Sequence, residues 1–128
     1  MADPKQKPVP KDLRTHEEKC KSIALEAHNL VFGEREGDYG HPLDDFSRTA
    51  EFWSTYLQGR SILPSGVSLG PQDVGAMMIL LKLSRECNKH LRDNLVDIAG
   101  YAITVERVID EQYQRKLDTE DKETESNL

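Results

Sequence analysis

The sequence has few of the features that mark several large classes of protein. Two cysteines in 128 residues are too few for a disulfide framework. The longest apolar run, Ala76–Leu81, is far shorter than the roughly 20 residues that a membrane span needs. The start, Met1-Ala-Asp-Pro-Lys, lacks the apolar stretch of a secretory signal. We therefore expect a protein of the reducing cytoplasm that does not associate with membranes.

Clusters of positive charge are also absent. The chain has 17 Lys and Arg residues against 23 Asp and Glu residues, which gives a net charge of −6. A general nucleic-acid binder needs clustered cations to displace phosphate counterions, so we do not expect that function. The same charge is compatible with one small phosphate ligand that binds through a metal ion.

The two ends of the chain show no apolar period. Residues 1–14 carry three prolines and four basic residues against two acidic ones, and residues 114–128 carry five acidic residues against three basic ones. We expect disordered tails over 1–14 and 114–128. Residues 15–113 then form a single helical domain, which is long enough to fold without disulfides.

Four segments of this domain have the apolar spacing of helices, and none has that of a strand. The first opens at Thr15, which forms a capping box with Glu18. The spacing predicts an all-α fold, a four-helix bundle. The segments lie at about 15–33, 42–57, 71–87 and 91–113.

The third segment is apolar on nearly every side. Such a helix lies in a bundle centre or at a subunit contact, so we expect a homo-oligomer. The fourth segment has one apolar face. The third segment contains Val74, Ala76, Met77, Met78, Ile79, Leu80, Leu81 and Leu83, and the apolar face of the fourth contains Leu95, Ile98, Ala99, Ala102, Val105 and Ile109.

The connection Gly33–Pro42 carries the first unusual polar residues. Arg35 and Tyr39 lie beside Gly40 on a stretch with three glycines. A guanidinium and a phenol on a glycine-rich turn suit contacts to a phosphate or a base. A plain helix–helix connector, which needs the same turn residues, is the alternative.

Charged residues also interrupt the helical segments. Lys82 and Arg85 share one side of the third, where they either reach water along the helix edge or face protein carboxylates or a ligand phosphate. Asp93 and Asp97 lie one turn apart on the fourth, in a stripe that continues through Gly100 to Thr104. Like charges at this spacing repel unless a cation lies between them. A solvated acidic face is the alternative.

These residues match a known pattern. Gly33-x-Arg35-x-x-x-Tyr39-Gly40-x-Pro42, with Phe46 and Trp53 after it, resembles a family of small phage and prophage proteins of uncharacterised function. The resemblance covers about residues 20–110. Its later part contains Asp73-Val74, Met77-Met78, Lys82-x-x-Arg85 and Asp93-x-x-x-Asp97-Ile-Ala-Gly100-Tyr101.

More distantly, the layout is similar to the all-α nucleoside triphosphate pyrophosphohydrolases, the MazG and dimeric dUTPase group. Those enzymes hold Mg²⁺ with an E-x-x-E pair on one helix and an E-x-x-D pair on a later one, and they release a monophosphate and pyrophosphate. Asp97 matches the last position of the second pair, and Asn94 stands where its glutamate belongs. The first pair is missing from the third segment.

The likeness implies a pyrophosphohydrolase that depends on Mg²⁺ (or Mn²⁺) and acts on a phage nucleotide pool. Two other functions stay open: capture of a nucleotide or nucleotide signal without turnover, and a structural oligomerisation module. The implied metal ligands are Asp93 and Asp97 with Asp38 or Asp45. The implied catalytic residues are Asp93, Asp97 and Lys82, and the implied nucleotide-binding residues are Arg35, Tyr39, Gly40, Trp53, Lys82, Arg85 and Tyr101.

Overall fold

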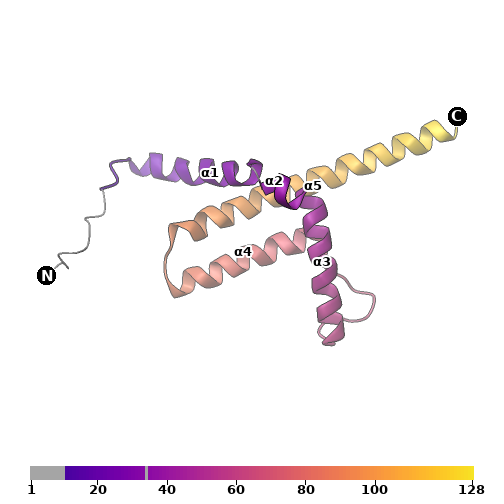
Figure 1. Cartoon of the computed structure of the whole chain (residues 1–128), viewed down its shortest axis with the longest axis horizontal. Helices are drawn as coiled ribbons and strands as arrows, with labels where there is room; N and C mark the ends of the chain where they lie inside the picture. Colours follow the sequence, from indigo (N-terminus) through magenta and orange to yellow (C-terminus); the bar gives the residue numbers. More distant parts are fainter. Residues whose placement is uncertain (1–10, 34) are drawn as a thin grey trace.

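The computed structural model describes residues 11–33 and 35–128, and this part of the chain consists of helices joined by loops and turns, without strands (Figure 1). The all-α prediction is therefore confirmed, and the four predicted helices are all present. A fifth, short helix lies within the predicted turn. No helix in the described ranges is long and apolar enough to cross a membrane. The helices are α1 (His16–Phe32), α2 (Arg35–Tyr39), α3 (Pro42–Gly59), α4 (Pro71–Asn88) and α5 (Arg92–Ser126).

Local sequence signals set where the first helices begin and end. The Thr15 hydroxyl accepts a hydrogen bond from the Glu18 amide at 3.2 Å, and the Glu18 carboxylate accepts one from the Thr15 amide at 2.7 Å. This is the predicted capping box, and it starts α1. Gly40 adopts a φ of +78°, a left-handed conformation that ends α2. Pro42 then occupies the first turn of α3.

The long helices are arranged around the first half of α5 (Figure 1). Helix α4 runs antiparallel to α5 along one side, and α1 packs against α5 on another. Helix α3 crosses this layer and contacts both α4 and α5. The core lies at the crossing, and its buried residues are Leu43, Phe46 and Ala50 from α3, Val74 from α4 and Val108 from α5.

One glycine allows α3, α4 and α5 to meet. A Cβ added to Gly75 would lie 2.3 Å from Cγ2 of Val105 and 3.5 Å from Cε2 of Phe46. Real atoms do not approach that closely, so this crossing needs a glycine. Gly100 is buried against Val31 of α1, where a Cβ would make an ordinary contact at 3.8 Å.

The turn between α4 and α5 is held by one carboxylate. Glu86 accepts a hydrogen bond from the Asn94 amide group at 2.8 Å and one from the Leu91 backbone at 3.3 Å, and it pairs with His90. Asn94 is buried, so this contact satisfies a polar group inside the packing of the two helices. The hydrogen bonds from Asn94 and His90 lower the pKa of Glu86 below its ordinary value.

The expectation of a disordered tail over 114–128 is wrong. Helix α5 continues to Ser126 and projects beyond the rest of the molecule (Figure 1, yellow). The Arg115 guanidinium donates to both carboxylate oxygens of Asp44 at 2.6 and 3.0 Å and to Glu111 at 3.0 Å. These contacts tie α5 to the start of α3 and lower the pKa of Asp44. Opposite charges four residues apart, such as Asp118 and Lys122, support the helix further. The predicted tail over 1–14 lies mostly outside the described residues.

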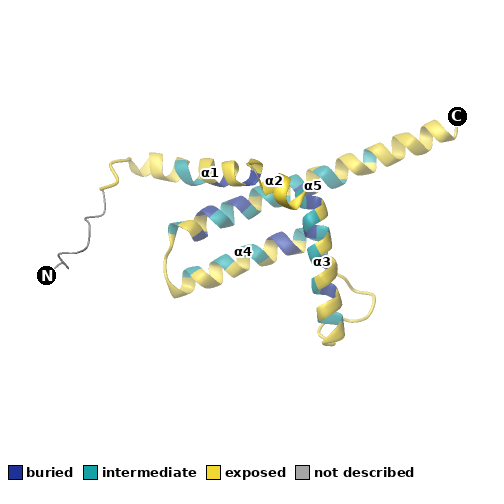
Figure 2. Ribbon diagram, in the orientation of Figure 1, coloured by how far each residue is buried: buried dark blue, intermediate teal, exposed yellow. Residues whose placement is uncertain are grey.

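The predicted apolar faces are only partly covered (Figure 2). On α5, Leu95 is 39% exposed and Ile109 is 46% exposed, although both were expected on the buried face. The fully buried positions of α5 are instead Asn94, Val96, Gly100 and Val108. On α4 only Val74 and Gly75 are fully buried. These positions are buried because α3 and α5 cover one side of α4, and because α1 packs on the Gly100 side of α5.

The Gly75 crossing predicts a specific destabilisation. Gly75→Ala forces its Cβ against a stiff valine, so we expect the free energy of unfolding to fall by about 1–3 kcal/mol. Val105→Ala in the same chain should recover part of this loss, because it removes the clashing methyl group. Urea denaturation followed by circular dichroism measures both effects. Gly59→Ala, also at a helical glycine but in open space, is the control and should be close to neutral.

The Glu86 contacts predict a pH dependence. A carboxylate whose folded pKa is lowered stabilises the fold above its unfolded pKa, which is near 4.5, and loses this contribution as the pH falls through its folded pKa. Glu86→Gln should therefore melt at a lower temperature than the wild type at pH 7. The difference should shrink below about pH 4.5. A difference in melting temperature that stays constant from pH 7 to pH 3 would contradict this assignment.

Candidate functional site

A small pocket lies where the end of α1, the short α2, the start of α3 and the middle of α5 come together. Its lining includes six residues with chemistry suited to a ligand, namely Arg35, Tyr39, Asp45, Asp97, Tyr101 and Arg107. Five of them were predicted from the sequence, from segments more than 50 residues apart. The fold therefore joins the glycine-rich turn and the Asp97–Tyr101 stretch in one site.

The α2 side of the pocket presents a cation beside an aromatic ring. The Arg35 guanidinium carbon lies 5.7 Å from the centre of the Tyr39 ring, within the range of a cation–π contact. Tyr39 is 56% exposed, so one of its faces remains available to a ligand. Gly40 also lines the pocket, and its amide donates to the Glu36 carbonyl at 2.8 Å. Gly40 therefore ends α2 and fixes the position of Tyr39.

Arg107 was not predicted as a site residue from the sequence. Its guanidinium lies 4.5 Å from the centre of the Phe32 ring and donates to the Val31 carbonyl at 3.3 Å and to Glu36 at 3.1 Å. It thus joins the C-terminal end of α1 to α2 across the pocket wall. A signal was present, because Arg107 continues the stripe of Asp97, Gly100 and Thr104 at helical spacing.

Asp97 forms an ion pair with α4. The Lys82 ammonium donates to the Asp97 carboxylate at 2.9 Å, and the side chain of Lys82 is only 15% exposed. Of the alternatives open for Lys82, the structure shows that it faces a protein carboxylate. Lys82 does not line the pocket itself. It is a supporting residue that fixes the Asp97 carboxylate from the α4 side.

The four predicted metal ligands are not gathered in one place. Asp45 and Asp97 line the pocket, Asp93 lines an adjoining groove, and Asp38 is exposed on α2 and lines neither. Within residues 11–33 and 35–128, no three His, Cys, Asp or Glu side chains are grouped so that they could hold a metal ion. An ammonium group already binds Asp97. The described residues of one chain therefore do not fit the magnesium site that the likeness implies.

Two other predicted residues lie away from the pocket. Trp53 packs against the hydrophobic core, beside the buried residues of α3. Arg85 is exposed on α4 and does not line the pocket. Tyr101 has both roles, because it lines the pocket and also packs against the core.

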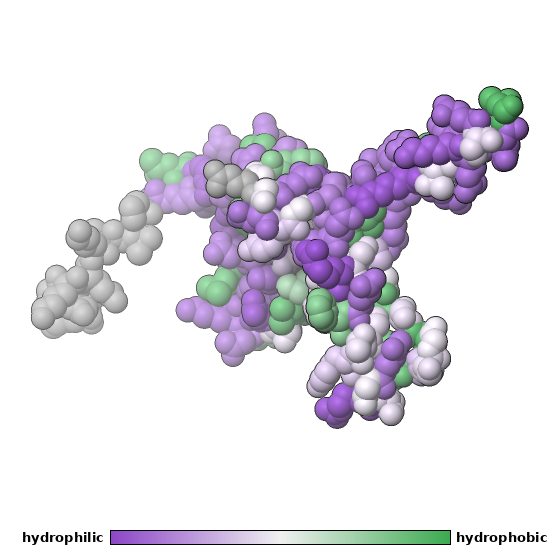
Figure 3. Space-filling model, turned by 45° about the vertical axis from the view of Figure 1, so that its right-hand side comes forward, coloured by the Kyte–Doolittle hydropathy of each residue, from purple (hydrophilic) through white to green (hydrophobic). Residues whose placement is uncertain are grey.

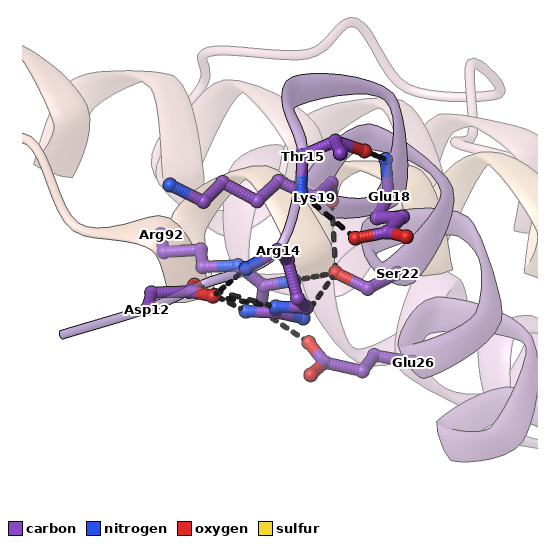
Figure 4. A network of polar contacts seen from close by, with 8 residues as sticks. All are labelled: Asp12, Arg14, Thr15, Glu18, Lys19, Ser22, Glu26 and Arg92. Carbon is purple, nitrogen blue, oxygen red and sulfur yellow. Dashed lines mark hydrogen bonds and ion pairs between the residues drawn. The ribbon is translucent and has the colours of Figure 1, made fainter. Parts of the chain in front are cut away.

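An open groove between α1 and α5 continues from the pocket, with Leu30, Val96 and Asp97 in the lining of both. The pocket encloses about 50 Å³, enough for one compact group, whereas the groove offers about 580 Å³. The far end of the groove is held by polar contacts (Figure 4). There Arg92 pairs with Glu26 and donates to the Ser22 hydroxyl, which also accepts from Arg14. These contacts fix α1 against the start of α5.

Comparison with known proteins gives a family and two relatives. The model of a family described as a domain of unknown function (DUF6378) matches residues 22–109. The Gene 55 protein of Mycobacterium phage L5 is 38% identical over 98 residues, which are 73% of this chain and 58% of that protein. The Gene 55 protein of Mycobacterium phage D29 is 37% identical over 102 residues, which are 77% of this chain and 62% of that protein. The chain thus spans about three fifths of each relative. No solved structure matches it.

The Lys82–Asp97 pair predicts different effects for the two aspartates of α5. Asp97→Asn leaves a largely buried ammonium without its counter-charge, so we expect the free energy of unfolding to fall by about 1–3 kcal/mol. Asp93 is exposed and makes no ion pair with any described residue. Asp93→Asn should therefore change the free energy of unfolding by less than about 0.5 kcal/mol. Urea denaturation at pH 7 measures both. Equal losses in the two variants would contradict a structural role for the pair.

Proposed function

The chain belongs to the DUF6378 family, whose model covers residues 22–109, and from this premise we propose that the pocket binds a nucleotide or a nucleotide-derived phosphate without hydrolysing it. The observation that carries the proposal is the convergence of Arg35, Tyr39 and Tyr101 with Arg107 around one small pocket. Every residue that lines the pocket lies within the part of the chain that the family model matches.

The phosphate of the ligand would lie among the two guanidinium groups. Arg35 forms no ion pair with any described residue, so its donors remain for an anion. Arg107 uses two of its five N–H groups on Val31 and Glu36, and it stays largely buried, where an ion contact is screened less by water. A compact phosphate group also matches the small enclosed volume of the pocket.

The rest of a nucleotide finds complementary groups in the same place. The exposed face of Tyr39 can stack on a base, and carboxylates accept hydrogen bonds from sugar hydroxyls or exocyclic amines. Asp45 and Asp97 are two carboxylates of the pocket lining that can serve this purpose, and the third, Glu36, pairs with Arg107. The groove along α1 and α5 provides room for the larger part of the ligand, since it continues directly from the pocket.

Binding without turnover is favoured over pyrophosphohydrolysis by the state of Asp97. In the hydrolase likeness this carboxylate would hold a divalent cation, but here the Lys82 ammonium binds it. The ammonium supplies positive charge, but unlike a metal ion it can neither coordinate oxygen ligands nor activate a water for attack on phosphorus. A phage protein with such a pocket would sequester a nucleotide or a nucleotide signal.

Binding of ATP, adenosine monophosphate and ADP-ribose in EDTA, measured by isothermal titration calorimetry, tests the proposal. We expect at least one of them to bind, and Arg35→Ala should weaken that binding about tenfold or more, a loss of about 1.4 kcal/mol. Arg85→Ala is the matched control, because Arg85 is also an exposed arginine but lies outside the pocket. Its affinity should equal that of the wild type.

Two results would contradict the proposal. The first is that none of the three nucleotides binds, or that both arginine variants lose affinity equally. The second is the release of monophosphate and pyrophosphate from ATP when Mg²⁺ is supplied, read by chromatography with Asp97→Ala alongside. That release would establish the pyrophosphohydrolase that the likeness implies.

A further inference from the structure

Arg107 already has a counter-charge within the chain. Its side chain is only 15% exposed, and its guanidinium donates to the Glu36 carboxylate at 3.1 Å. A guanidinium this far buried needs such a partner, because it has lost most of its hydration. Glu36 also lines the pocket. Its carboxylate therefore lies at the guanidinium where the proposed function places the phosphate of the ligand.

The position of Arg107 does not depend on Glu36 alone. The Arg107 guanidinium lies 4.5 Å from the centre of the Phe32 ring and donates to the Val31 carbonyl at 3.3 Å. Both contacts are made with the end of α1, whereas Glu36 lies on α2. Arg107 can therefore stay in the pocket wall when Glu36 leaves it, and the N–H group that had bound Glu36 can donate to another anion.

The side chain of Glu36 is bound by Arg107 alone among the described residues. This side chain is 46% exposed, and α2, which carries it, has five residues of which none is buried. The face of the molecule in Figure 3 is mainly hydrophilic, with scattered hydrophobic residues. A Glu36 carboxylate that leaves Arg107 therefore enters water. If a phosphate replaces it, the exchange costs the fold little, since the phosphate becomes the counter-charge of Arg107.

Building on the proposed function, on which this step rests, we propose that Glu36 is an internal competitor of the ligand. The phosphate binds Arg107 in place of the Glu36 carboxylate. Arg35 has no such competitor, since it forms no ion pair with any described residue. One phosphate has several acceptor oxygens and can bind both guanidinium groups, whereas Glu36 binds only that of Arg107. A phosphate can therefore displace Glu36, and Glu36 limits how tightly the phosphate binds.

The competition gives Glu36→Gln two effects of opposite sign. The variant loses the counter-charge of Arg107, so its melting temperature without ligand should be lower than that of the wild type. It also loses the competitor, so phosphate binding should tighten about two- to fivefold, which corresponds to the energy of a partly exposed ion pair. An ion pair that only holds α2 in place predicts the opposite for binding, because its loss would loosen the pocket wall.

Titrations with ATP in EDTA and with inorganic phosphate, at constant ionic strength, test the competition. Calorimetry measures the dissociation constant of ATP, and NMR of ¹⁵N-labelled protein measures that of phosphate. Both ligands should bind Glu36→Gln about two to five times more tightly than the wild type. Glu111→Gln is the matched control, because Glu111 also pairs with an arginine, Arg115, but lies outside the pocket lining. Its affinities should equal those of the wild type.

The phosphate titration separates the competition from nucleotide binding. If no nucleotide binds but phosphate binds Glu36→Gln more tightly than the wild type, the exchange at Arg107 is supported and the nucleotide pocket fails. If ATP binds Glu36→Gln equally or more weakly, the competition is overturned and the nucleotide pocket stands. Equal tightening in Glu111→Gln would overturn the competition too, since the change of net charge would then explain it. Binding of neither ligand to either protein would overturn both proposals.

Discussion

The close approach of α4 to α5 at Gly75 is the constraint on which the rest of the structure depends. With no side chain at this position, Val105 of α5 fits directly against the α4 backbone, and Phe46 of α3 packs beside it. Two turns further along α4, the same approach brings the Lys82 ammonium within 2.9 Å of Asp97. Asp97 is thereby held in the wall of the pocket. A packing requirement at one glycine thus determines the electrostatics of a site that Gly75 does not itself line.

In the metal-dependent enzymes that the layout of this chain resembles, the carboxylate that Asp97 matches holds Mg²⁺, whereas here the Lys82 ammonium binds Asp97. A carboxylate that binds an ammonium inside the protein supports the fold and fixes the local charge, without the oxygen-rich ligand set that Mg²⁺ prefers. The pocket also contains two arginines, two tyrosines, Asp45, Glu36 and Thr104, and the arginines and tyrosines suit recognition of a phosphate and an aromatic ring. These groups support the proposal of a pocket that binds a nucleotide without hydrolysing it.

Local signals predicted much of the fold, and tertiary contacts decided the rest. The Thr15 capping box, Gly40 and Pro42 act within a few residues, so the starts of α1 and α3 could be read from the sequence. The extent of α5 could not, because Arg115 is bound by Asp44, 71 residues earlier in the chain. The side of α5 that is buried also depends on where α1 packs. For the site, Arg35, Tyr39 and Asp97 were predicted, whereas Trp53 belongs to the core and Arg107 was recognised only from its contacts.

The most direct test of a nucleotide-binding pocket is a titration of ATP, in EDTA, into ¹⁵N-labelled protein followed by NMR. If ATP lies where the arginines and tyrosines converge, the amide signals of Gly40, Gly100 and Thr104 should shift with a common saturating dependence on ATP concentration. The signals of residues 116–126, on the projecting end of α5, should stay in place. Unchanged signals at the three pocket amides, or shifts confined to the projecting end, would contradict the proposed site.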